Sequence, residues 1–370
     1  MITSIPVNII AEAGVNHNGD TGMALRLVEE AARAGADAVK FQTFRADRLL
    51  TRQAAKASYQ MLTTDAGESQ FEMIRKLELS EEAHSLIASR CRELGIEFLS
   101  TPFDIESLRF LAEHLDLGRI KISSGEITNA PLLLAAARTA KPVLLSTGMS
   151  SLGEVETALS VLAFGYLEPE AVPSREGFSR IYRDETAQRE LANKVTLLHC
   201  TTEYPAPACS INLAALSTLR SAFGLPVGYS DHTEGIAVAI AAVALGATVI
   251  EKHFTLDRNL PGPDHKASLE PGELRDLVRS ARTVTDAIGA PIKVSQAAEC
   301  VNMPVARKSL VTLKPVRRGE QFTPDNLGSK RPGTGISPLY FWDILGTAAR
   351  RDYAADELLE GLDGLLTTRE

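Results

Sequence analysis

The sequence predicts an α/β fold: a (β/α)₈ TIM barrel followed by a small C-terminal domain. Short β-branched stretches alternate with longer stretches rich in Ala, Leu and Glu that have helical periodicity. This alternation occurs eight times within roughly the first 290 residues, which is the count for a closed barrel. No G-x-G-x-x-G turn follows the first strand, which disfavours the alternative, an open doubly wound sheet.

The strands are expected where apolar and β-branched residues run together between turn residues. Their expected ranges are 7–14, 38–44, 97–103, 119–126, 142–148, 195–201, 226–232 and 249–255. A helix is expected after each strand, at 21–34, 80–94, 105–112, 130–138, 152–163, 213–223, 236–245 and 270–288. Each helix can serve as the crossover that a parallel sheet requires.

Two segments are too long to be plain connections. Residues 45–79 follow a strand, so we expect them on the active face of the barrel, as a lid. Residues 165–193 follow a helix, so we expect them on the opposite face, with a structural or oligomeric role.

Beyond the eighth helix the pattern changes to short strands, a basic cluster and turns rich in Pro and Gly. This change predicts a barrel domain over residues 1–288, a linker over 289–304 and a second domain over 305–370. The composition, with 44% hydrophobic and 23% charged residues, is that of a globular α/β chain.

The charge balance argues against an anionic macromolecule as the main partner. Lys and Arg total 39 against 47 Asp and Glu, a net charge of −8, so neither nucleic acid nor an anionic membrane is the expected partner. The N-terminus has no secretory pattern and the longest apolar run, 236–250, is too short for a membrane span, so a cytoplasmic location is expected. The four cysteines lack C-x-x-C spacing, so reduced structural thiols are expected.

Polar side chains end every expected strand, where a barrel carries its active site. They are Glu12, Lys40, Gln42, Thr101, Lys121, Ser123, Ser124, Glu126, Ser146, Thr147, His199, Thr201, Thr202, Ser230, His232, Lys252 and His253. Since buried polar residues are uncommon elsewhere in a barrel, eight polar strand ends indicate a catalytic mouth.

His232 and His253 end adjacent strands, which brings two imidazoles within reach of one divalent cation. With oxygen donors around them, Mn²⁺ or Mg²⁺ fits better than structural zinc. The alternative is a pair of core or substrate-binding histidines. His199 lies earlier in its strand, and we expect it to support the core.

Lys40 and Lys121 point from the second and fourth strands into a ring of hydroxyl groups, which suits a phosphate or a carboxylate. The alternative is a desolvated, nucleophilic lysine that forms a Schiff base. Glu12 ends the first strand and suits general base catalysis, or else a structural salt bridge to Lys40. Asp264, in the loop after the eighth strand, suits binding of hydroxyl groups, or else lies in a solvated loop.

At these positions the chain resembles the sialic acid synthase family, whose members condense phosphoenolpyruvate with an amino sugar. The resemblance covers nearly the whole length. Its motifs are IAEAGVNHNGD from Ile10, VKFQTF from Val39, STPFD from Ser100, KISSGEITN from Lys121, LSTGMS from Leu145, LHCTTEYPAP from Leu198, VGYSDHT from Val227, IEKHFTLD from Ile250 and GPDHKASLEP from Gly262. The tail, with ARKSL from Ala306 and the later KRPGTGISP, resembles the antifreeze-like (SAF) module, of β-clip type, that ends these synthases.

The resemblance implies a role for each matching residue. His232 and His253 would hold a divalent metal, Mn²⁺ in the first place and Mg²⁺ or Co²⁺ as alternatives. Phosphoenolpyruvate would be surrounded by Lys40, Thr101, Lys121, Ser124, Ser146, Thr202, Tyr204 and Ser230, with many members carrying Asn in place of Thr202. Glu12 and Asp264 would be catalytic, and the sugar would be bound by Gln42, Glu126, Asp264 and Arg331.

The resemblance also implies a domain-swapped homodimer, in which Arg331 reaches the neighbouring subunit's barrel and contacts the acylamino group. The alternative for the tail is a module that binds ice or a surface glycan independently. The implied acceptor is an open-chain N-acylmannosamine. Residues 54–80 resemble legionaminate-type members more closely than neuraminate-type members, which favours 2,4-diacetamido-2,4,6-trideoxymannose over N-acetylmannosamine. A pseudaminate-type synthase and a metal-independent pyruvate aldolase remain the alternatives.

Overall fold

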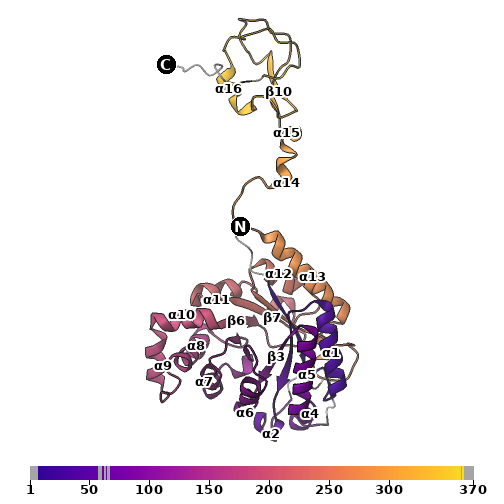
Figure 1. Cartoon of the computed structure of the whole chain (residues 1–370), viewed down its shortest axis with the longest axis vertical. Helices are drawn as coiled ribbons and strands as arrows, with labels where there is room; N and C mark the ends of the chain where they lie inside the picture. Colours follow the sequence, from indigo (N-terminus) through magenta and orange to yellow (C-terminus); the bar gives the residue numbers. More distant parts are fainter. Residues whose placement is uncertain (1–6, 57–60, 62–63, 65–66, 360, 362–370) are drawn as a thin grey trace. The chain divides into compact units, whose positions relative to one another are not determined.

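The computed structural model describes residues 7–56, 61, 64, 67–359 and 361. The chain divides into two compact units, Met1–Ala290 and Pro291–Glu370. In the first unit, helices surround a ring of strands (Figure 1).

Eight parallel strands form the barrel in the order β3-β2-β1-β8-β7-β6-β5-β4, and β3 and β4 lie side by side to complete the ring. The strands are β1 (Asn8–Gly14), β2 (Ala38–Thr43), β3 (Glu97–Pro102), β4 (Ile120–Ile122), β5 (Val143–Ser146), β6 (Val195–Cys200), β7 (Val227–Asp231) and β8 (Val249–His253). The predicted (β/α)₈ barrel is therefore confirmed.

Crossover helices cover the outside of the barrel, and α1, α5 and α13 pack next to one another there (Figure 1). The helices of this unit are α1 (Thr21–Ala34), α2 (Ala46–Leu49), α4 (Gln70–Lys76), α5 (Glu81–Leu94), α6 (Ile105–Arg109) with the π-helical η1 (Phe110–His114), α7 (Ala130–Arg138), α8 (Leu152–Leu167), α9 (Arg175–Tyr182), α10 (Glu185–Lys194), α11 (Ala215–Phe223), α12 (Ala237–Ala244) and α13 (Pro271–Ile288); the short 3₁₀ turns are η2 (Ser124–Glu126), η3 (Ala208–Ser210) and η4 (His265–Ala267).

Local sequence explains where these helices begin and end. The Asp20 side chain accepts the Met23 N–H at the start of α1, and Gly35 ends that helix in the left-handed region at φ 80°. Leu27 and Val28 bury the inner face of α1 against the sheet. Helix α5 also has capped ends and one apolar face: it begins after Ser80, whose side chain accepts the Ala83 N–H, and ends at Gly95.

Two layers of side chains fill the barrel, and their order follows the strand period of two. A fully apolar layer lies deeper in the barrel and consists of Ile10, Ala38, Leu99, Leu144, Leu198 and Val249. Two residues further along the same strands lie Glu12, Lys40, Thr101, Ser146, Cys200 and Glu251. The strand alternation therefore places a ring of mostly polar groups directly above an apolar floor.

The structure differs from the sequence prediction at two elements. The fourth strand ends at Ile122 rather than at residue 126, because residues 124–126 turn into η2, with the Glu126 N–H bonded to the Ser123 carbonyl. The fifth helix continues to Leu167 instead of ending at residue 163, and α9 and α10 then pack against it. Residues 165–193 are thus mostly helical and belong to the outer helix layer.

The described part of segment 45–79 approaches the barrel mouth. Helix α4 begins after Ser69, whose side chain and Glu72 form a capping box, and its residues Gln70 and Ile74 line the cavity at the mouth. Part of the stretch that favours a legionaminate-type acceptor lies outside the described residues. The lid remains a prediction.

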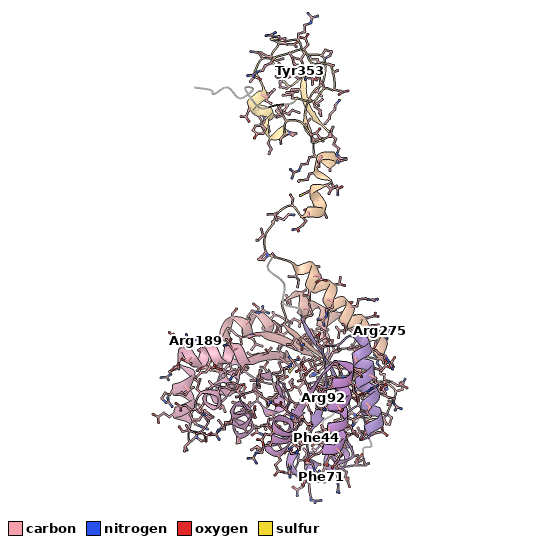
Figure 2. The ribbon with its side chains drawn as sticks, in the orientation of Figure 1. Phe44, Phe71, Arg92, Arg189, Arg275 and Tyr353 are labelled. Carbon is pink, nitrogen blue, oxygen red and sulfur yellow. The ribbon has the colours of Figure 1, made fainter. Side chains whose placement is uncertain are left out.

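The second unit has a small core of its own, formed by residues that include Leu310, Phe322 and Tyr353. Tyr353 is labelled in Figure 2. Its strands β9 (Ser309–Thr312) and β10 (Leu327–Lys330) are antiparallel. The short helices of this unit are α14 (Ala297–Cys300), α15 (Met303–Ala306), η5 (Pro338–Tyr340) and α16 (Phe341–Ile344).

Among the residues that the structure describes, we find no helix with the length and apolar character needed to span a membrane.

Candidate active site

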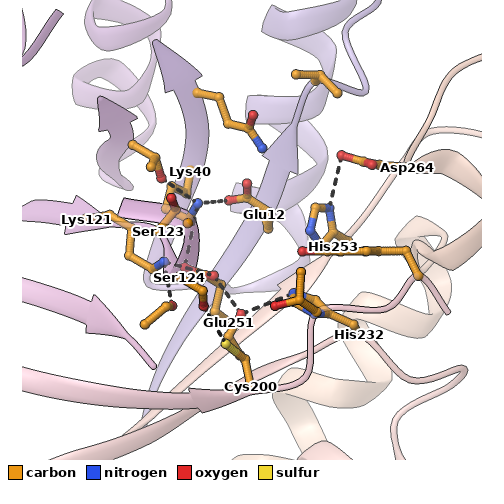
Figure 3. Close-up of a pocket in the computed structure, with 18 of the residues that line it drawn as sticks. Glu12, Lys40, Lys121, Ser123, Ser124, Cys200, His232, Glu251, His253 and Asp264 are labelled. Atoms are coloured by element: carbon orange, nitrogen blue, oxygen red, sulfur yellow. Dashed lines mark hydrogen bonds and ion pairs between the residues drawn. The ribbon is translucent and has the colours of Figure 1, made fainter. Parts of the chain in front are cut away.

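A cavity of about 420 Å³ opens at the carboxyl ends of the barrel strands (Figure 3). It is lined by fourteen of the sequence-predicted site residues: Glu12, Lys40, Gln42, Thr101, Lys121, Ser123, Ser124, Ser146, Thr202, Tyr204, Ser230, His232, His253 and Asp264. A cavity of this size accommodates a small-molecule substrate pair rather than a macromolecule.

Two predicted residues do not line this cavity. Glu126 lies in η2, where its carboxylate accepts the Asn129 side-chain amide at 2.6 Å. Arg331 belongs to the second unit and is exposed, with its Nε donating to the Ala306 carbonyl at 3.0 Å. Their predicted contacts with the sugar remain predictions.

Lys40 occupies the centre of the polar ring. Its ammonium lies 2.6 Å from Glu12 and 3.7 Å from Glu251, and it donates to the Thr101 hydroxyl at 3.0 Å. Burial alone would lower the pKa of Lys40, but the carboxylates of Glu12 and Glu251 outweigh it and raise the pKa. Lys40 is therefore a permanent cation inside the cavity.

Glu12 lies on the same wall and has a perturbed pKa. Its neighbours across the sheet are Lys40 in β2 and His253 in β8. Burial raises the pKa of Glu12 to about 7, against the lowering effect of Lys40. A carboxyl group with this pKa can both give and accept a proton near neutrality.

Lys121 is the second buried ammonium. It donates to the Ser146 hydroxyl at 2.8 Å and lies 3.7 Å from Glu251. Burial lowers the pKa of Lys121, and the proximity of Lys40 acts in the same direction. The two lysines thus face one carboxylate from two sides, and an anionic ligand would complete their neutralisation.

Glu251 is the main site residue that sequence reasoning missed. It accepts the Ser230 hydroxyl at 2.8 Å and lies between the two lysines (Figure 3). Burial would raise the pKa of Glu251, but Lys121 and Lys40 outweigh burial and lower it below its usual range. The strand period was the available signal, because Glu251 lies two residues before His253 on the same face of β8.

Ser124 lines the cavity together with Ser123, which the sequence places at the same strand end, and with Cys200, which sequence reasoning missed. The Ser124 hydroxyl accepts the Gly148 N–H at 2.9 Å and lies 3.0 Å from the Cys200 sulfur. A Cβ on Gly148 would lie 2.8 Å from the hydroxyls of Ser124 and Thr202, so only glycine permits this close approach.

His232 and His253 face each other across β7 and β8, with ring centroids 5.6 Å apart. His232 Nδ1 lies 2.6 Å from the Thr201 carbonyl; because a carbonyl only accepts, Nδ1 carries the hydrogen. The lone pair is then on Nε2, which lies 3.4 Å from the Ser230 hydroxyl. Burial lowers the pKa of His232 to about 4 and that of His253 well below its ordinary value. Both imidazoles are therefore neutral at pH 7, as metal ligation requires.

The donor set around these imidazoles fits a divalent cation. His253 Nδ1 is buried without a hydrogen-bond partner and lies 3.9 Å from the Asp264 carboxylate. The Tyr204 ring packs on the His232 ring, with 4.2 Å between the ring centroids, and limits rotation of the imidazole. Within the described part of the chain no group of three or more His, Cys, Asp or Glu side chains suits a metal, so a bound ion would take its other ligands from water or substrate.

Four further strand-end residues do not line the cavity: Thr147, His199, Thr201 and Lys252. His199 Nε2 lies 2.7 Å from the Ile211 carbonyl, consistent with the expected supporting role. Lys252 has no exposed surface and pairs with Asp231 at 2.8 Å. It points away from the cavity because neighbouring strand residues face opposite sides.

The fold and this cavity together define a barrel enzyme for small anionic substrates, with cations and hydroxyls at the strand ends. Residues 27–293 match the model of the NeuB family, and residues 307–363 match the SAF domain. The chain belongs to the NeuB family and ends in a SAF domain.

Named relatives agree with this assignment. The chain is 49% identical over 351 residues to the N,N'-diacetyllegionaminic acid synthase of Campylobacter jejuni, covering 95% of this chain and 98% of the relative. It is 43% identical to the synthase of the same name from Legionella pneumophila, covering 96% and 94%. The crystal structure of N-acetylneuraminic acid synthetase from Leptospira borgpetersenii superposes with a TM-score of 0.66 at 34% identity, covering 80% of this chain and 90% of that one.

Proposed function

We propose that this sialic-acid-type synthase condenses phosphoenolpyruvate with an open-chain N-acylmannosamine-type sugar and water. The products are a nine-carbon 2-keto acid and phosphate. The observation that carries this proposal is the pair of buried ammonium groups, Lys40 and Lys121, within a ring of hydroxyls at the barrel mouth. Their charge complements the phosphate and carboxylate of phosphoenolpyruvate.

The residues of the cavity would act mainly by orientation and electrostatics. Lys40 and Lys121 hold the phosphate and carboxylate, assisted by the hydroxyl groups around them: Thr101, Ser124, Ser146, Thr202, Tyr204 and Ser230. The enol carbon of phosphoenolpyruvate then lies against the aldehyde carbon of the sugar and forms the new C–C bond.

The remaining steps balance without an outside reagent. The aldehyde oxygen takes up a proton, and water adds to carbon two of the former phosphoenolpyruvate and loses a proton. The C–O bond to phosphate then breaks, the new hydroxyl on carbon two passes its proton to the departing phosphate, and the 2-keto acid is left. Glu12 is the proposed residue for proton transfer because it contacts the cavity beside Lys40. Gln42 and Asp264 line the same cavity and are the proposed contacts to sugar hydroxyls.

His232 and His253 would hold the divalent cation, Mn²⁺ first and Mg²⁺ or Co²⁺ as alternatives. When bound, this ion would supply Lewis-acid polarisation of the sugar aldehyde. The neutral imidazoles and the unpaired Nδ1 of His253 support this proposal.

The proposed acceptor is 2,4-diacetamido-2,4,6-trideoxymannose. The two relatives named N,N'-diacetyllegionaminic acid synthase support this choice, at 49% and 43% identity over nearly the whole chain. N-Acetylmannosamine is the second acceptor, since the N-acetylneuraminic acid synthetase of Leptospira borgpetersenii is also similar, at 34% identity. We further propose a domain-swapped homodimer in which Arg331 contacts the acylamino group in the partner's barrel.

The test is phosphate release by the purified full-length protein. Phosphoenolpyruvate should be supplied with each candidate sugar, with and without a chelator and added Mn²⁺. Release that requires both substrates supports the synthase, the preferred sugar defines the acceptor, and loss with chelator followed by recovery with Mn²⁺ supports the metal. Phosphoenolpyruvate labelled with ¹⁸O at the bridging position should yield labelled phosphate, because C–O cleavage keeps that oxygen on phosphorus.

The lowered pKa of Lys121 favours one competing candidate, a Schiff-base aldolase acting on pyruvate. That enzyme would release no phosphate and would tolerate a chelator. Borohydride with pyruvate would then trap a covalent adduct on Lys121, detectable as a mass increase of the peptide. Absence of the adduct together with phosphate release excludes this candidate.

A further inference from the structure

Asp231 and Lys252 form an ion pair that the proposed chemistry does not use. They are direct neighbours across β7 and β8, and their charged groups lie 2.8 Å apart. Both side chains are 0% exposed. Neither lines the cavity, because Ser230, His232, Glu251 and His253 occupy the alternate strand positions that do.

The pair also fixes the backbone on either side of His232. One oxygen of Asp231 accepts the N–H and the hydroxyl of Thr233, both at 2.8 Å, and the Tyr229 hydroxyl at 3.1 Å. The Lys252 ammonium donates to the Thr233 carbonyl as well. The residues before and after His232 are therefore tied to one carboxylate and one ammonium.

The same contacts link the two strand ends that carry the imidazoles. Asp231 immediately precedes His232, and Lys252 immediately precedes His253. Register slippage or a change in spacing between β7 and β8 would break the ion pair and the bond to Thr233 together. The linkage therefore joins the two strand ends whose His232 and His253 rings lie 5.6 Å apart.

Stability alone does not account for a buried ion pair at this place. Both charged groups are fully buried, so each has lost its hydration, and the attraction between two buried charges often does no more than offset that cost. A pair of apolar side chains of similar volume is often as stable as a buried ion pair. A charged pair also orients the backbone groups that it binds, because its hydrogen bonds have a preferred geometry.

We propose that Asp231 and Lys252 are positioning residues that set the spacing and orientation of His232 and His253 for one shared divalent cation. This inference rests on the proposed metal site. Neither residue contacts the ion; both act through the strands that carry the imidazoles. Outer groups that orient metal ligands typically contribute about 10-fold to 100-fold to metal affinity.

The test compares Mn²⁺ binding by chelator-treated full-length protein and two double variants. Asp231→Asn with Lys252→Met removes the ion pair without leaving a buried charge, and Asn retains an acceptor for Thr233. Asp37→Asn with Arg282→Met is the matched control, because Asp37 and Arg282 also form an ion pair at 2.7 Å that binds a strand backbone, at the Ile9 N–H. That pair lies at the opposite, N-terminal end of the strands.

Mn²⁺ binding is measured by the electron paramagnetic resonance signal of free Mn²⁺, and folding by circular dichroism. We expect the dissociation constant to rise about 10-fold to 100-fold in the Asp231/Lys252 variant and to stay within about twofold of wild type in the control. Thr233→Val removes a single hydroxyl contact to Asp231 and serves as the test if the double variant does not fold. Its dissociation constant for Mn²⁺ should also rise, by a smaller factor.

Three results would overturn the inference. Unchanged Mn²⁺ affinity in folded Asp231/Lys252 and Thr233 variants shows that the pair has no positioning role. Equal weakening in the control shows general loosening of the barrel. Absence of Mn²⁺ binding to the wild type removes both this inference and the metal site; phosphate release in the presence of chelator then shows whether the synthase reaction itself stands.

Discussion

The Lys40 ammonium lies 2.6 Å from the Glu12 carboxylate, and both side chains are almost fully buried in the polar ring that lines the cavity. Because Glu251 also approaches Lys40, at 3.7 Å, the lysine keeps a counter-ion if Glu12 is neutralised. Glu12 can therefore be replaced without leaving Lys40 unpaired.

Glu12→Gln should lower kcat by about 10²-fold to 10⁴-fold, the range for loss of a general acid or base. The KM for phosphoenolpyruvate should change much less, since Lys40 and Lys121 remain. Steady-state phosphate release checks both values, with the exposed Asp116→Asn as a control of unchanged activity. A variant with normal kcat and only a lower melting temperature would show that Glu12 is a structural partner of Lys40.

The barrel could be predicted from the sequence because its signals are local. Eight β-branched stretches predict the architecture, and the polar residues at the strand ends include twelve that line the cavity. Tyr204 was implied only by the family resemblance, and Asp264 lies in the loop after the eighth strand. Residue type alone does not predict which side chains face the cavity. Glu251 and Lys252 are both charged and both lie in β8, but only Glu251 lines the cavity. Only the strand register, anchored by Val249 in the apolar layer, decides between them.

Other features left no signal in the apolar periodicity of the sequence. The end of β4 is set by η2, so Glu126 turns toward Asn129 rather than into the cavity. The approach of Gln70 and Ile74 to the cavity depends on how the described part of segment 45–79 packs over the mouth. Helical periodicity predicts neither arrangement.

Removal of the metal should abolish phosphate release, and added Mn²⁺ should restore it. His253→Asn should prevent that recovery, because His253 Nδ1 is buried without another hydrogen-bond partner. His199→Asn is the matched histidine control, since its ring bonds to the Ile211 carbonyl, and it should still recover. Full activity of the chelator-treated wild type, or recovery of His253→Asn, would contradict the two-histidine site.

His17 predicts a pH dependence of stability. Burial, with His84 and His265 nearby, lowers the pKa of His17 to about 3, and the ring accepts the Gly19 N–H at 3.0 Å. The unfolded chain binds this proton near pH 6.5, so the stability that His17 contributes is complete above about pH 6.5 and is lost as the pH falls toward 3.

Between pH 4 and 6, His17→Gln should therefore reduce the pH dependence of the unfolding free energy by about 1.4 kcal/mol per pH unit, the equivalent of one proton. Urea unfolding at several pH values measures this slope. The exposed His114→Gln should leave it unchanged. A slope in His17→Gln equal to that of the wild type would show that His17 is protonated in the folded protein as readily as in the unfolded chain.

Arg331 tests whether the SAF domain completes the sugar site. Arg331→Ala should raise the KM for the sugar by about 10-fold to 100-fold, the value of a hydrogen bond from a charged group, with the KM for phosphoenolpyruvate nearly unchanged. Arg317→Ala, an exposed arginine of the same unit, is the control and should affect neither value.

Truncation after Gly289 distinguishes two hypotheses for the C-terminal unit: a contribution to the sugar site, or a module that binds ice or glycan independently. If Arg331 from a partner's SAF domain contacts the acylamino group, the truncated barrel should lose synthase activity, and the loss should be no smaller than that in Arg331→Ala. A module that binds ice or glycan independently predicts the opposite: a fully active barrel and an Arg331→Ala variant with unaltered sugar kinetics. Because the unit has its own core around Phe322 and Tyr353, loss of activity on truncation should occur without unfolding of the barrel, which circular dichroism checks.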